Sequence, residues 1–324
     1  MKNKLIFLVL IQLVFTNLGF CAKPKILFVR SEGVQFQEVF RAMNEELATS
    51  YEIKEQVLEK SSTFDEFKAL VTKQEPQLLI LMDNKPVEYA LKYNAALPNP
   101  AKRVKGVALM SLNLKQLLKD SKEISGIAFE PSAYLLVTQF RYLLEKTLKN
   151  VVVFYRKSLF QNMIREVQGQ LKGEGIELIA VDVETKGNSK AAINEVLKEN
   201  LKNYNSDKTG ALWVLLDSAL INQISFNQVW MPAMQESRLS VITGTENLIS
   251  TDMKFGVFAI TPNLPDLAHQ AIQQVESILK DHRAPTVFGV EEVVSINKIL
   301  NTSRAKEIKL QLRKDRLTDI KLIE

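Results

Sequence analysis

Leu78-Leu79-Ile80-Leu81-Met82 is an uninterrupted apolar run that stops abruptly at Asp83-Asn84-Lys85-Pro86. A short apolar run bounded by turn-forming residues is typical of a strand buried on both faces of a sheet. Similar runs occur at 25–29 and 104–110, and residues 36–48 between them carry apolar side chains at helical spacing. This alternation predicts an α/β fold with a parallel sheet covered by helices on both faces.

The same alternation begins again in the second half of the chain. Apolar runs at 151–155 and 211–216 predict buried strands, and residues 160–173 between them predict a helix. We therefore expect two Rossmann-like lobes with parallel sheets, built from the blocks 25–123 and 127–247. Further strands are predicted at 51–58, 176–183 and 240–243, and further helices at 64–72, 87–93, 133–148, 190–204 and 219–236.

The remaining segments are too few for a third domain. They are a strand at 256–261, a helix at 264–279, a strand at 290–296 and a C-terminal helix that carries the basic residues of 304–321. These pieces are expected to complete the two lobes, so the chain must cross between the lobes more than once. Several crossings make a hinge, and hinges allow two lobes to close around a ligand.

The expected crossings set the lobe boundaries. We expect the first lobe to contain residues 22–124 and about 254–285, and the second lobe to contain residues 125–250 and about 286–324. The segments expected to cross between the lobes are 124–128, 247–256 and 284–290.

The start of the chain has the features of a secretory leader. Lys2 and Lys4 precede an apolar run at 5–20, and the small residues Cys21 and Ala22 follow. A retained anchor is the alternative, but roughly 16 apolar residues are marginal for a hydrocarbon core of about 30 Å. Residues 1–21 are therefore predicted to be a signal peptide, and the mature protein is expected to be periplasmic or otherwise extracytoplasmic.

Cys21 is the only cysteine of the chain, and its fate depends on the cleavage site. Leu18-Gly19-Phe20-Cys21 loosely resembles a bacterial lipobox, which would make the protein a lipoprotein anchored through Cys21. Phe20 disfavours this alternative because a small residue is expected there. A mature chain without cysteine cannot form disulfides, so its stability must come from a packed core.

Composition indicates an ordinary soluble globular protein, with 46% apolar and 24% charged residues. The formal net charge of +5 falls by the two charges of Lys2 and Lys4 once the leader is removed. This small, scattered excess does not point to a nucleic-acid partner.

Polar residues that follow the predicted strands form the candidate ligand site, because ligands of open parallel sheets bind at the carboxyl ends of strands. In the first lobe these residues are Arg30, Ser31, Asp83, Asn84 and Ser111. In the second lobe they are Tyr155, Arg156, Asp217, Ser218, Thr245 and Glu246.

The residue types at these positions suit a small polar ligand. Arg30 or Arg156 could hold a carboxylate through its planar guanidinium, and Asp83 or Asp217 could receive an ammonium group. Tyr155 offers a ring face for an aromatic or cationic part. Both aspartates also have a structural interpretation, as the N-terminal caps of the helices that follow them.

Two tryptophans and two histidines are interpreted as structural. Trp213 lies within a predicted strand, and Trp230 shares a helical packing face with Phe226 and Met234. His269 and His282 lie in a late helical region away from strand ends, and no Cys/His cluster with zinc spacing accompanies them. The chain also has no nucleophile elbow and no phosphate loop. We therefore expect neither an enzyme nor a cofactor.

Three motifs occur in the same order as in a known family. Ile124-Ser125-Gly126-Ile127, the strand ending in Asp217-Ser218, and Ile296-Asn297-Lys298 before Asn301-Thr302-Ser303-Arg304-Ala305 resemble the ABC transporter substrate-binding proteins of the tryptophan/tyrosine-binding type. In that family the first motif reads roughly Asn-x-Thr-Gly-hydrophobic, the second ends in Asp-Ser, and Thr-Ala follows the third. The resemblance covers nearly the whole mature chain.

The ligand-facing loops depart from the family pattern. Asp83-Asn84-Lys85-Pro86 stands where members carry Thr-Pro, and Ser111-Leu112 where they often carry Asp-Pro. Tyr155-Arg156-Lys157 replaces their Tyr-Asn-Pro. The resemblance therefore implies the fold and leaves the identity of the ligand open.

The resemblance implies a type I periplasmic binding protein that captures an amino acid or similar small molecule for a membrane permease. We expect a monomer whose partners are that small-molecule ligand and the ABC permease. Two alternatives stay open at this point: a periplasmic sensory module that reports its ligand to a receptor or kinase, and a degenerate scaffold that binds no small molecule.

Overall fold

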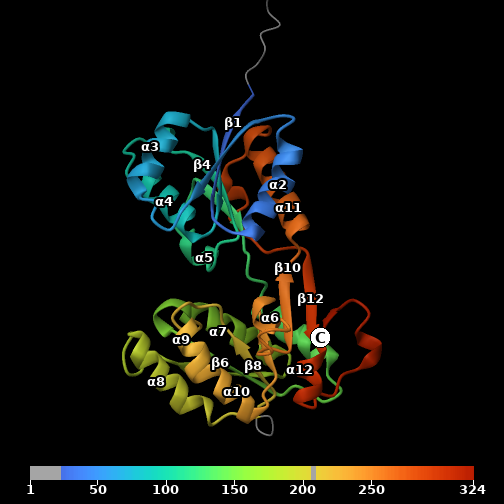
Figure 1. Ribbon diagram of the computed structural model, residues 1–324. Helices are drawn as coiled ribbons and strands as arrows, with labels where there is room; N and C mark the ends of the chain where they lie inside the picture. The colour runs from blue at the N-terminus through green and yellow to red at the C-terminus, as the bar shows by residue number, and fades with distance from the viewer. Residues whose placement is uncertain (1–22, 206–208) are drawn as a thin grey trace, which may run out of the picture.

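The computed structural model describes residues 23–205 and 209–324, arranged as two lobes that are joined by thin connecting segments (Figure 1). Each lobe contains one sheet of mostly parallel strands covered by helices, so the predicted α/β fold with two sheets is confirmed. The predicted signal peptide, 1–21, lies outside the described residues. In the described part of the chain, no helix combines the length and apolar character needed to cross a membrane.

The first lobe is built on a six-stranded sheet in the order β11-β5-β4-β3-β1-β2, and all of its strand pairs are parallel. Its strands are β1 (Lys25–Ser31), β2 (Glu52–Leu58), β3 (Leu78–Met82), β4 (Lys105–Leu109), β5 (Ile124–Ile127) and β11 (Val290–Glu291). Its helices are α2 (Val34–Leu47), α3 (Phe64–Gln74), α4 (Asn84–Ala95), α5 (Leu114–Leu117) and α11 (Leu264–Leu279), with 3₁₀ turns η1 (Pro100–Lys102) and η4 (Pro285–Val287).

The second lobe is built on a seven-stranded sheet in the order β13-β12-β10-β9-β8-β6-β7. Only the pairing of β10 with β12 is antiparallel among the described strands. Its strands are β6 (Asn150–Tyr155), β7 (Glu177–Asp182), β8 (Ala211–Val214), β9 (Val241–Thr243), β10 (Phe258–Pro262), β12 (Ile296–Asn301) and β13 (Lys321–Ile323). Its helical segments are α6 (Ala133–Leu143), α7 (Lys157–Gly173), α8 (Lys190–Leu201), α9 (Gln223–Ser225), the π-helical η2 (Phe226–Trp230), α10 (Met231–Ser237), η3 (Asn247–Ile249), α12 (Thr302–Glu307) and η5 (Lys314–Arg316).

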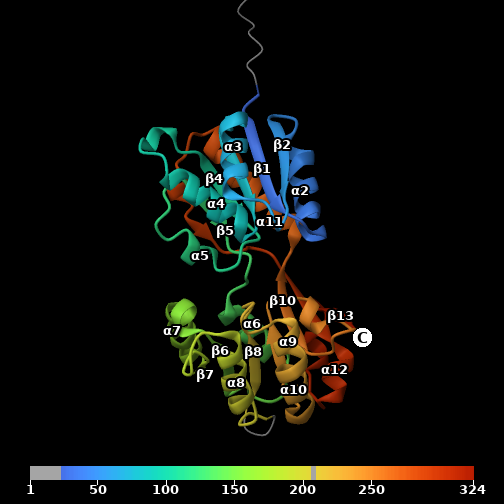
Figure 2. The same ribbon diagram turned by 60° about the vertical axis from the view of Figure 1, so that its left-hand side comes forward.

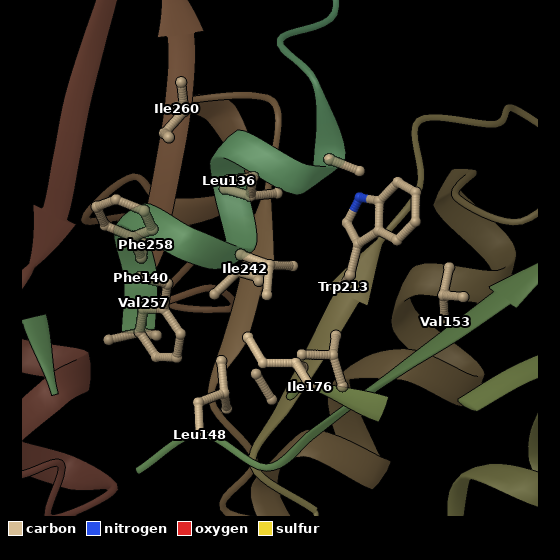
Figure 3. Packing of buried hydrophobic residues seen from close by; sticks show 14 of the residues in the cluster. Leu136, Phe140, Leu148, Val153, Ile176, Trp213, Ile242, Val257, Phe258 and Ile260 are labelled. Atoms are coloured by element: carbon tan, nitrogen blue, oxygen red, sulfur yellow. The ribbon is translucent and has the colours of Figure 1, made fainter. Parts of the chain in front are cut away.

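Each sheet is buried because apolar helix faces cover both of its sides. In the first lobe, α2 and α11 pack on one side and α3 and α4 on the other. In the second lobe, α6 contributes Leu136 and Phe140 to a cluster with Ile242 and Phe258 of the sheet (Figure 3). The predicted core position of Trp213 in this cluster is confirmed. Trp230 is also buried as predicted, and its indole N–H donates to the carbonyl of Leu220 at 2.8 Å.

The crossings between the lobes differ from the prediction in three places. β5 belongs to the first sheet, so the first crossing follows Ile127. β10 was expected in the first lobe but pairs with β9 and β12 in the second. The single strand predicted at 290–296 is two strands, β11 and β12, which lie in different sheets. A strand that is apolar and buried on both faces packs equally well in either sheet, so its own sequence does not indicate the lobe to which it belongs.

The C-terminal helix predicted over 304–321 is wrong. α12 ends at Glu307, and Lys309 adopts a left-handed conformation with φ 58°. Leu310 and Leu312 then run beside the end of α6, where Arg313 N–H donates to the carbonyl of Leu143 at 2.9 Å. These contacts favour an extended path because they satisfy the backbone of both segments.

A glycine of β5 allows the first sheet to pack closely at the first crossing. A Cβ at Gly126 would lie 2.4 Å from the carbonyl oxygen of Ala108 and 2.8 Å from the side chain of Leu114. We predict that Gly126→Ala lowers the free energy of unfolding by about 1–3 kcal/mol, because the neighbouring backbone must shift. Urea denaturation measures the change.

Gly169→Ala is the matched control, because a Cβ at this position in α7 has no heavy atom within 4 Å. It should raise the free energy of unfolding by up to about 1 kcal/mol through helix propensity. Equal stabilities of the two variants would contradict the packing role of Gly126.

Candidate functional site

The carboxyl ends of both sheets face the opposite lobe (Figure 2). β5 leads from the first sheet directly towards α6 of the second lobe, and β10 leads from the second sheet directly into α11 of the first. Because the neighbouring strands are parallel to β5 and β10, their carboxyl ends point the same way. We call these two sheet ends the interlobe faces.

Both lobes repeat the same order of their first five strands. The order is β2-β1-β3-β4-β5 in the first lobe and β7-β6-β8-β9-β10 in the second. In such sheets the chain order reverses between the first and third strands, and ligands bind at the carboxyl side of this switch point. The switch points therefore lie between β1 and β3 and between β6 and β8.

The first switch point is spanned by a hydrogen bond between two of the predicted residues. Ser31 Oγ donates to Asp83 Oδ2 at 2.6 Å, and the backbone N–H of Asn84 donates to Asp83 Oδ1 at 2.8 Å. Asp83 is thus the N-cap of α4, so its structural interpretation is confirmed. Asn84 forms two hydrogen bonds with the backbone of Leu112, which fix the loop after β3 to the loop after β4.

The other two predicted residues of the first lobe are buried. Arg30 donates from Nε to Glu55 Oε1 on β2, and from Nη1 to the carbonyl of Ser31. Its guanidinium is therefore held by a carboxylate of its own lobe. Ser111 is fully buried after β4, and its hydroxyl has no hydrogen-bond partner among the described residues.

The second switch point is spanned by an ion pair. Arg156 donates from Nε to Asp217 Oδ2 at 2.6 Å and from Nη2 to Oδ1 at 2.8 Å. The side chain of Asp217 is only 2% exposed, whereas that of Arg156 is 23% exposed. The hydrogen bonds to Asp217 raise the pKa of Arg156 above its ordinary value. This two-pronged geometry is the strong form of a charged hydrogen bond.

Asp217 is not the N-cap of the next helix. Its Oδ1 accepts from the backbone N–H of Ala219 at 2.9 Å, which shapes a turn ahead of α9. Asn222 caps α9, because its Oδ1 accepts from the N–H groups of Ile224 and Ser225. The capping interpretation of Asp217 was therefore wrong, and its carboxylate mainly serves the ion pair.

The remaining predicted residues of the second lobe are less closely connected. Tyr155 is partly buried at the end of β6, and burial together with nearby Asp182 raises the pKa of its phenol. Ser218 is exposed and Thr245 is half-buried. Glu246 accepts from Lys321 Nζ of the edge strand β13 at 2.7 Å, so its carboxylate is bound away from the switch point.

Two acidic residues that the prediction did not include also belong to this region. Glu184, after β7, accepts from the backbone N–H and the hydroxyl of Ser158, both at 2.7 Å. Burial opposes its ionisation, but the hydrogen bonds from Ser158 and the charge of Arg156 hold its pKa below the ordinary value. Glu184 follows a predicted strand, so the rule of strand ends could have found it.

Glu130 lies in the first crossing, between β5 and α6. Burial raises the pKa of its carboxyl above the ordinary value, while a hydrogen bond from the backbone N–H of Asn113 acts in the opposite direction. Asn113 has a left-handed backbone with φ 54°. No sequence pattern singles out Glu130, since its burial depends on the loop after β4.

The charged groups at the interlobe faces are largely satisfied within their own lobe. Arg30 has Glu55, and Arg156 has Asp217. A charged ligand must therefore exchange with these internal partners or use the neutral donors beside them. Within residues 23–205 and 209–324, no group of three or more His, Cys, Asp or Glu side chains could hold a metal ion.

Among the comparisons with known proteins, only the comparison with solved structures found similar proteins. No family model matches the sequence, and no curated protein is detectably similar. An ABC domain in complex with L-Trp from Streptococcus pneumonia is 14% identical, with 92% of this chain and 100% of that chain covered and a TM-score of 0.60. A ligand-free, open substrate-binding protein with adhesive properties from Clostridium difficile is 12% identical, with 93% and 99% covered and a TM-score of 0.64.

The fold is not confined to transport proteins. A LacI transcriptional regulator from Rhodococcus species is 8% identical, with 89% of this chain and 97% of that chain covered and a TM-score of 0.53. At these identities the similarity establishes the fold alone. The predicted type I periplasmic binding protein fold is confirmed, and the tryptophan or tyrosine specificity stays a prediction.

We predict that Asp217→Ala lowers the free energy of unfolding by about 2 kcal/mol, because the partly buried Arg156 guanidinium loses its partner. Asp217→Asn should cost less, since its amide oxygen can still accept from Ala219. Chemical denaturation measures both variants, and the exposed Ser218→Ala serves as a control that should stay within about 0.5 kcal/mol of the wild type. An Asp217→Ala protein as stable as that control would show that the ion pair contributes nothing.

The raised pKa of Glu130 predicts a specific pH dependence. A carboxyl that is harder to ionise in the folded than in the unfolded protein makes stability fall as the pH rises above the ordinary value of 4.5. Glu130→Gln should therefore be more stable than the wild type at neutral pH, and the difference should shrink below pH 4.5. Denaturation midpoints from pH 4 to pH 8 test this, with Glu38→Gln as a control for the loss of one exposed carboxylate.

Proposed function

We propose that this protein is an extracytoplasmic solute-binding protein that captures a small ligand between its lobes and delivers it to an ABC permease. The observation that carries this proposal is the arrangement of the two sheets, whose switch points face each other's lobe across a hinge. The similarity to solved solute-binding proteins over more than 90% of the chain supports it.

The connecting segments suit a hinge. The second crossing is a single residue, Asn263, between β10 and α11. Its N–H donates to the carbonyl of Ser295 at 3.0 Å, so the second and third crossings form one hydrogen-bonded ribbon. Asn297 Nδ2 adds a bond to the carbonyl of Pro262 at 3.4 Å. The first crossing, at 128–132, runs separately, and bending these few residues would move the lobes as rigid bodies.

We place the ligand between the interlobe faces, which carry the predicted residues Arg30, Ser31, Asp83, Asn84, Ser111, Tyr155, Arg156, Asp217, Ser218, Thr245 and Glu246. An amino acid suits the second switch point because it brings one charge of each sign. Its carboxylate would take the guanidinium of Arg156, and its ammonium group would take the carboxylate of Asp217. The exchange leaves no buried charge unpaired, which is the condition for burying charges at all.

The extracytoplasmic location rests on the leader-like start of the sequence. In this proposal the leader is removed before Ala22 and the binder diffuses freely. Lipidation of Cys21 would instead tether the same two lobes to a membrane. Intact-mass measurement of the exported protein distinguishes the two, because a lipidated cysteine adds the mass of its acyl chains.

One observation favours the alternative of a scaffold that binds no small molecule. The internal ion pairs at both interlobe faces are complete without a ligand. A sensory module is a further alternative, and a permease and ATPase encoded beside the gene would favour transport over sensing.

Ligand capture is tested by thermal unfolding of ligand-free protein, prepared by unfolding and refolding, against a library of amino acids and small metabolites. A ligand specific for the native state at a hundred times its Kd adds about 2.7 kcal/mol, which raises the Tm measurably. Small-angle scattering should then show a smaller radius of gyration with the same compound. The absence of any stabilising compound, or binding without compaction, would contradict capture between the lobes.

A further inference from the structure

Two buried glutamines lie among the apolar side chains of α11. Gln270 is 8% exposed and Gln274 is 2% exposed, and the two are one helical turn apart on the same face of the helix. The other buried positions of α11 are all apolar. An apolar side chain would fill these positions without needing hydrogen-bond partners, so the contacts of the two glutamines indicate why they are there.

Gln274 connects α11 to the two strands that lead into the first and third crossings. Ser125 Oγ of β5 donates to Gln274 Oε1 at 2.9 Å. Gln274 Nε2 donates to Glu291 Oε2 of β11 at 2.9 Å and to the carbonyl of Gly126 at 3.4 Å. β5 ends directly before the first crossing and β11 directly before the third. One side chain therefore joins the beginnings of both crossings.

Gln270 binds the third crossing itself. Its Nε2 donates to the carbonyl of Glu292 at 3.0 Å and to Glu291 Oε2 at 3.2 Å. Its Oε1 accepts from the backbone N–H of Val294 at 3.4 Å. Because α11 follows the second crossing directly, Gln270 connects the second crossing to the third.

Apolar side chains attach each crossing to the first lobe. Phe129, Leu264 and Val293 lie in or directly beside the first, second and third crossings, and all three pack against the core cluster that α2 and α11 share. The first-lobe ends of the crossings are thus held both by this packing and by the hydrogen bonds of the two glutamines.

The second lobe holds the opposite ends of the crossings. Ala133 belongs to its core and Ile296 packs against that core, while β10 is part of its sheet. The residues left between the two lobes are 130–132 in the first crossing, Asn263 in the second and 294–295 in the third. These are few residues, so the attachment of their ends determines how the lobes can move.

We propose that Gln270 and Gln274 are positioning residues of the hinge, which hold the first-lobe ends of the three crossings as one rigid unit. The lobes then move only by bending within the residues between the two cores. Both glutamines donate to the same oxygen, Glu291 Oε2, and hydrogen bonds to a carboxylate are stronger than those between neutral groups. This inference rests on the proposed capture of a ligand between the lobes, because it assigns the bending points of that closure.

Stabilisation of the first lobe alone is the competing explanation. A buried polar network of this kind also favours one packing arrangement of its own lobe. The two explanations differ in one measurable quantity, the range of distances between the lobes. A hinge role requires that this range widens when the network is broken, whereas a purely structural role changes only the stability.

Gln270→Met is the test variant, because methionine has a similar length and helix propensity but lacks the amide. Spin labels at Lys68→Cys in α3 and Lys198→Cys in α8 report the interlobe distance by pulsed electron resonance on ligand-free protein that begins at Ala22. Both lysines are exposed, and Cys21 is the only natural cysteine. The width of the distance distribution should increase by about half, since more orientations of the lobes become populated.

Hydrogen exchange measured by mass spectrometry gives a second readout. In Gln270→Met the amides of 292–295 should exchange at least about threefold faster, because a protecting hydrogen bond is lost. Gln273→Met is the matched control, since Gln273 is exposed on the same helix between the two glutamines. Its distance distribution and exchange rates should equal those of the wild type.

The proposal is overturned if Gln270→Met and Gln273→Met have the same distance distribution. A lower stability of Gln270→Met with an unchanged distribution would assign the glutamine to the core and would also overturn it. If Gln270→Met does not fold, Ser125→Ala/Gln274→Met decides in the same way, because it removes both partners of one hydrogen bond and leaves no unsatisfied hydroxyl.

These measurements need no ligand. A protein that captures no ligand would still show the wider distribution in Gln270→Met, so failure of the proposed function and failure of this inference are distinguishable.

Discussion

The crossing at Asn263 is the constraint on which the arrangement of the molecule depends. β10 ends at Pro262 and α11 begins at Leu264, so one residue separates a strand of the second sheet from a helix of the first lobe. Such a short connection forces the carboxyl end of β10 to lie next to the first lobe. Parallel pairing then turns the carboxyl ends of β9, β8 and β6 in the same direction.

Because the strand order is repeated, each lobe must satisfy the carboxylate of an aspartate at the same place in its sheet. The two lobes do so with related sets of hydrogen-bond donors. In each lobe an aspartate follows the third strand, directly at the switch point. Asp83 is satisfied by a hydroxyl and a backbone N–H, whereas Asp217 is satisfied by a guanidinium and a backbone N–H. Asp217 therefore takes part in an ion pair at its switch point, whereas Asp83 does not, and the buried Arg30 of the first lobe pairs with Glu55 of β2 instead.

The local sequence pattern predicted the strands and the polar residues that follow them. It did not predict features that depend on contacts with distant parts of the chain. Apolar runs such as 78–82 became strands, and the polar residues after them lie at the sheet ends where the rule placed them. The sheet to which β10 belongs was not predictable, because a strand buried on both faces has the same composition in either lobe. The strand predicted at 290–296 failed for a related reason, since the crossing within it has no glycine or proline to mark it.

Partners across the fold set the chemistry of the candidate site in the same way. Glu55 lies in an amphipathic strand, and nothing in its sequence context shows that it neutralises Arg30. Glu130 is partly buried, and the loop after β4 contacts it through the N–H of Asn113. The sequence therefore predicted which polar residue types follow the strands, but not which of them pair with each other. This pairing decides which candidate side chains are left to contact a ligand.

The ion pair of the second lobe limits the kind of ligand that can bind at its interlobe face. At the interlobe face, Asp217 is desolvated and must keep a cation whether or not a ligand is present, so a ligand of one charge that displaces Arg156 would leave a buried charge unpaired. A ligand with both signs avoids this cost. The proposed capture of a ligand between the lobes therefore favours a zwitterion over an ion of one sign.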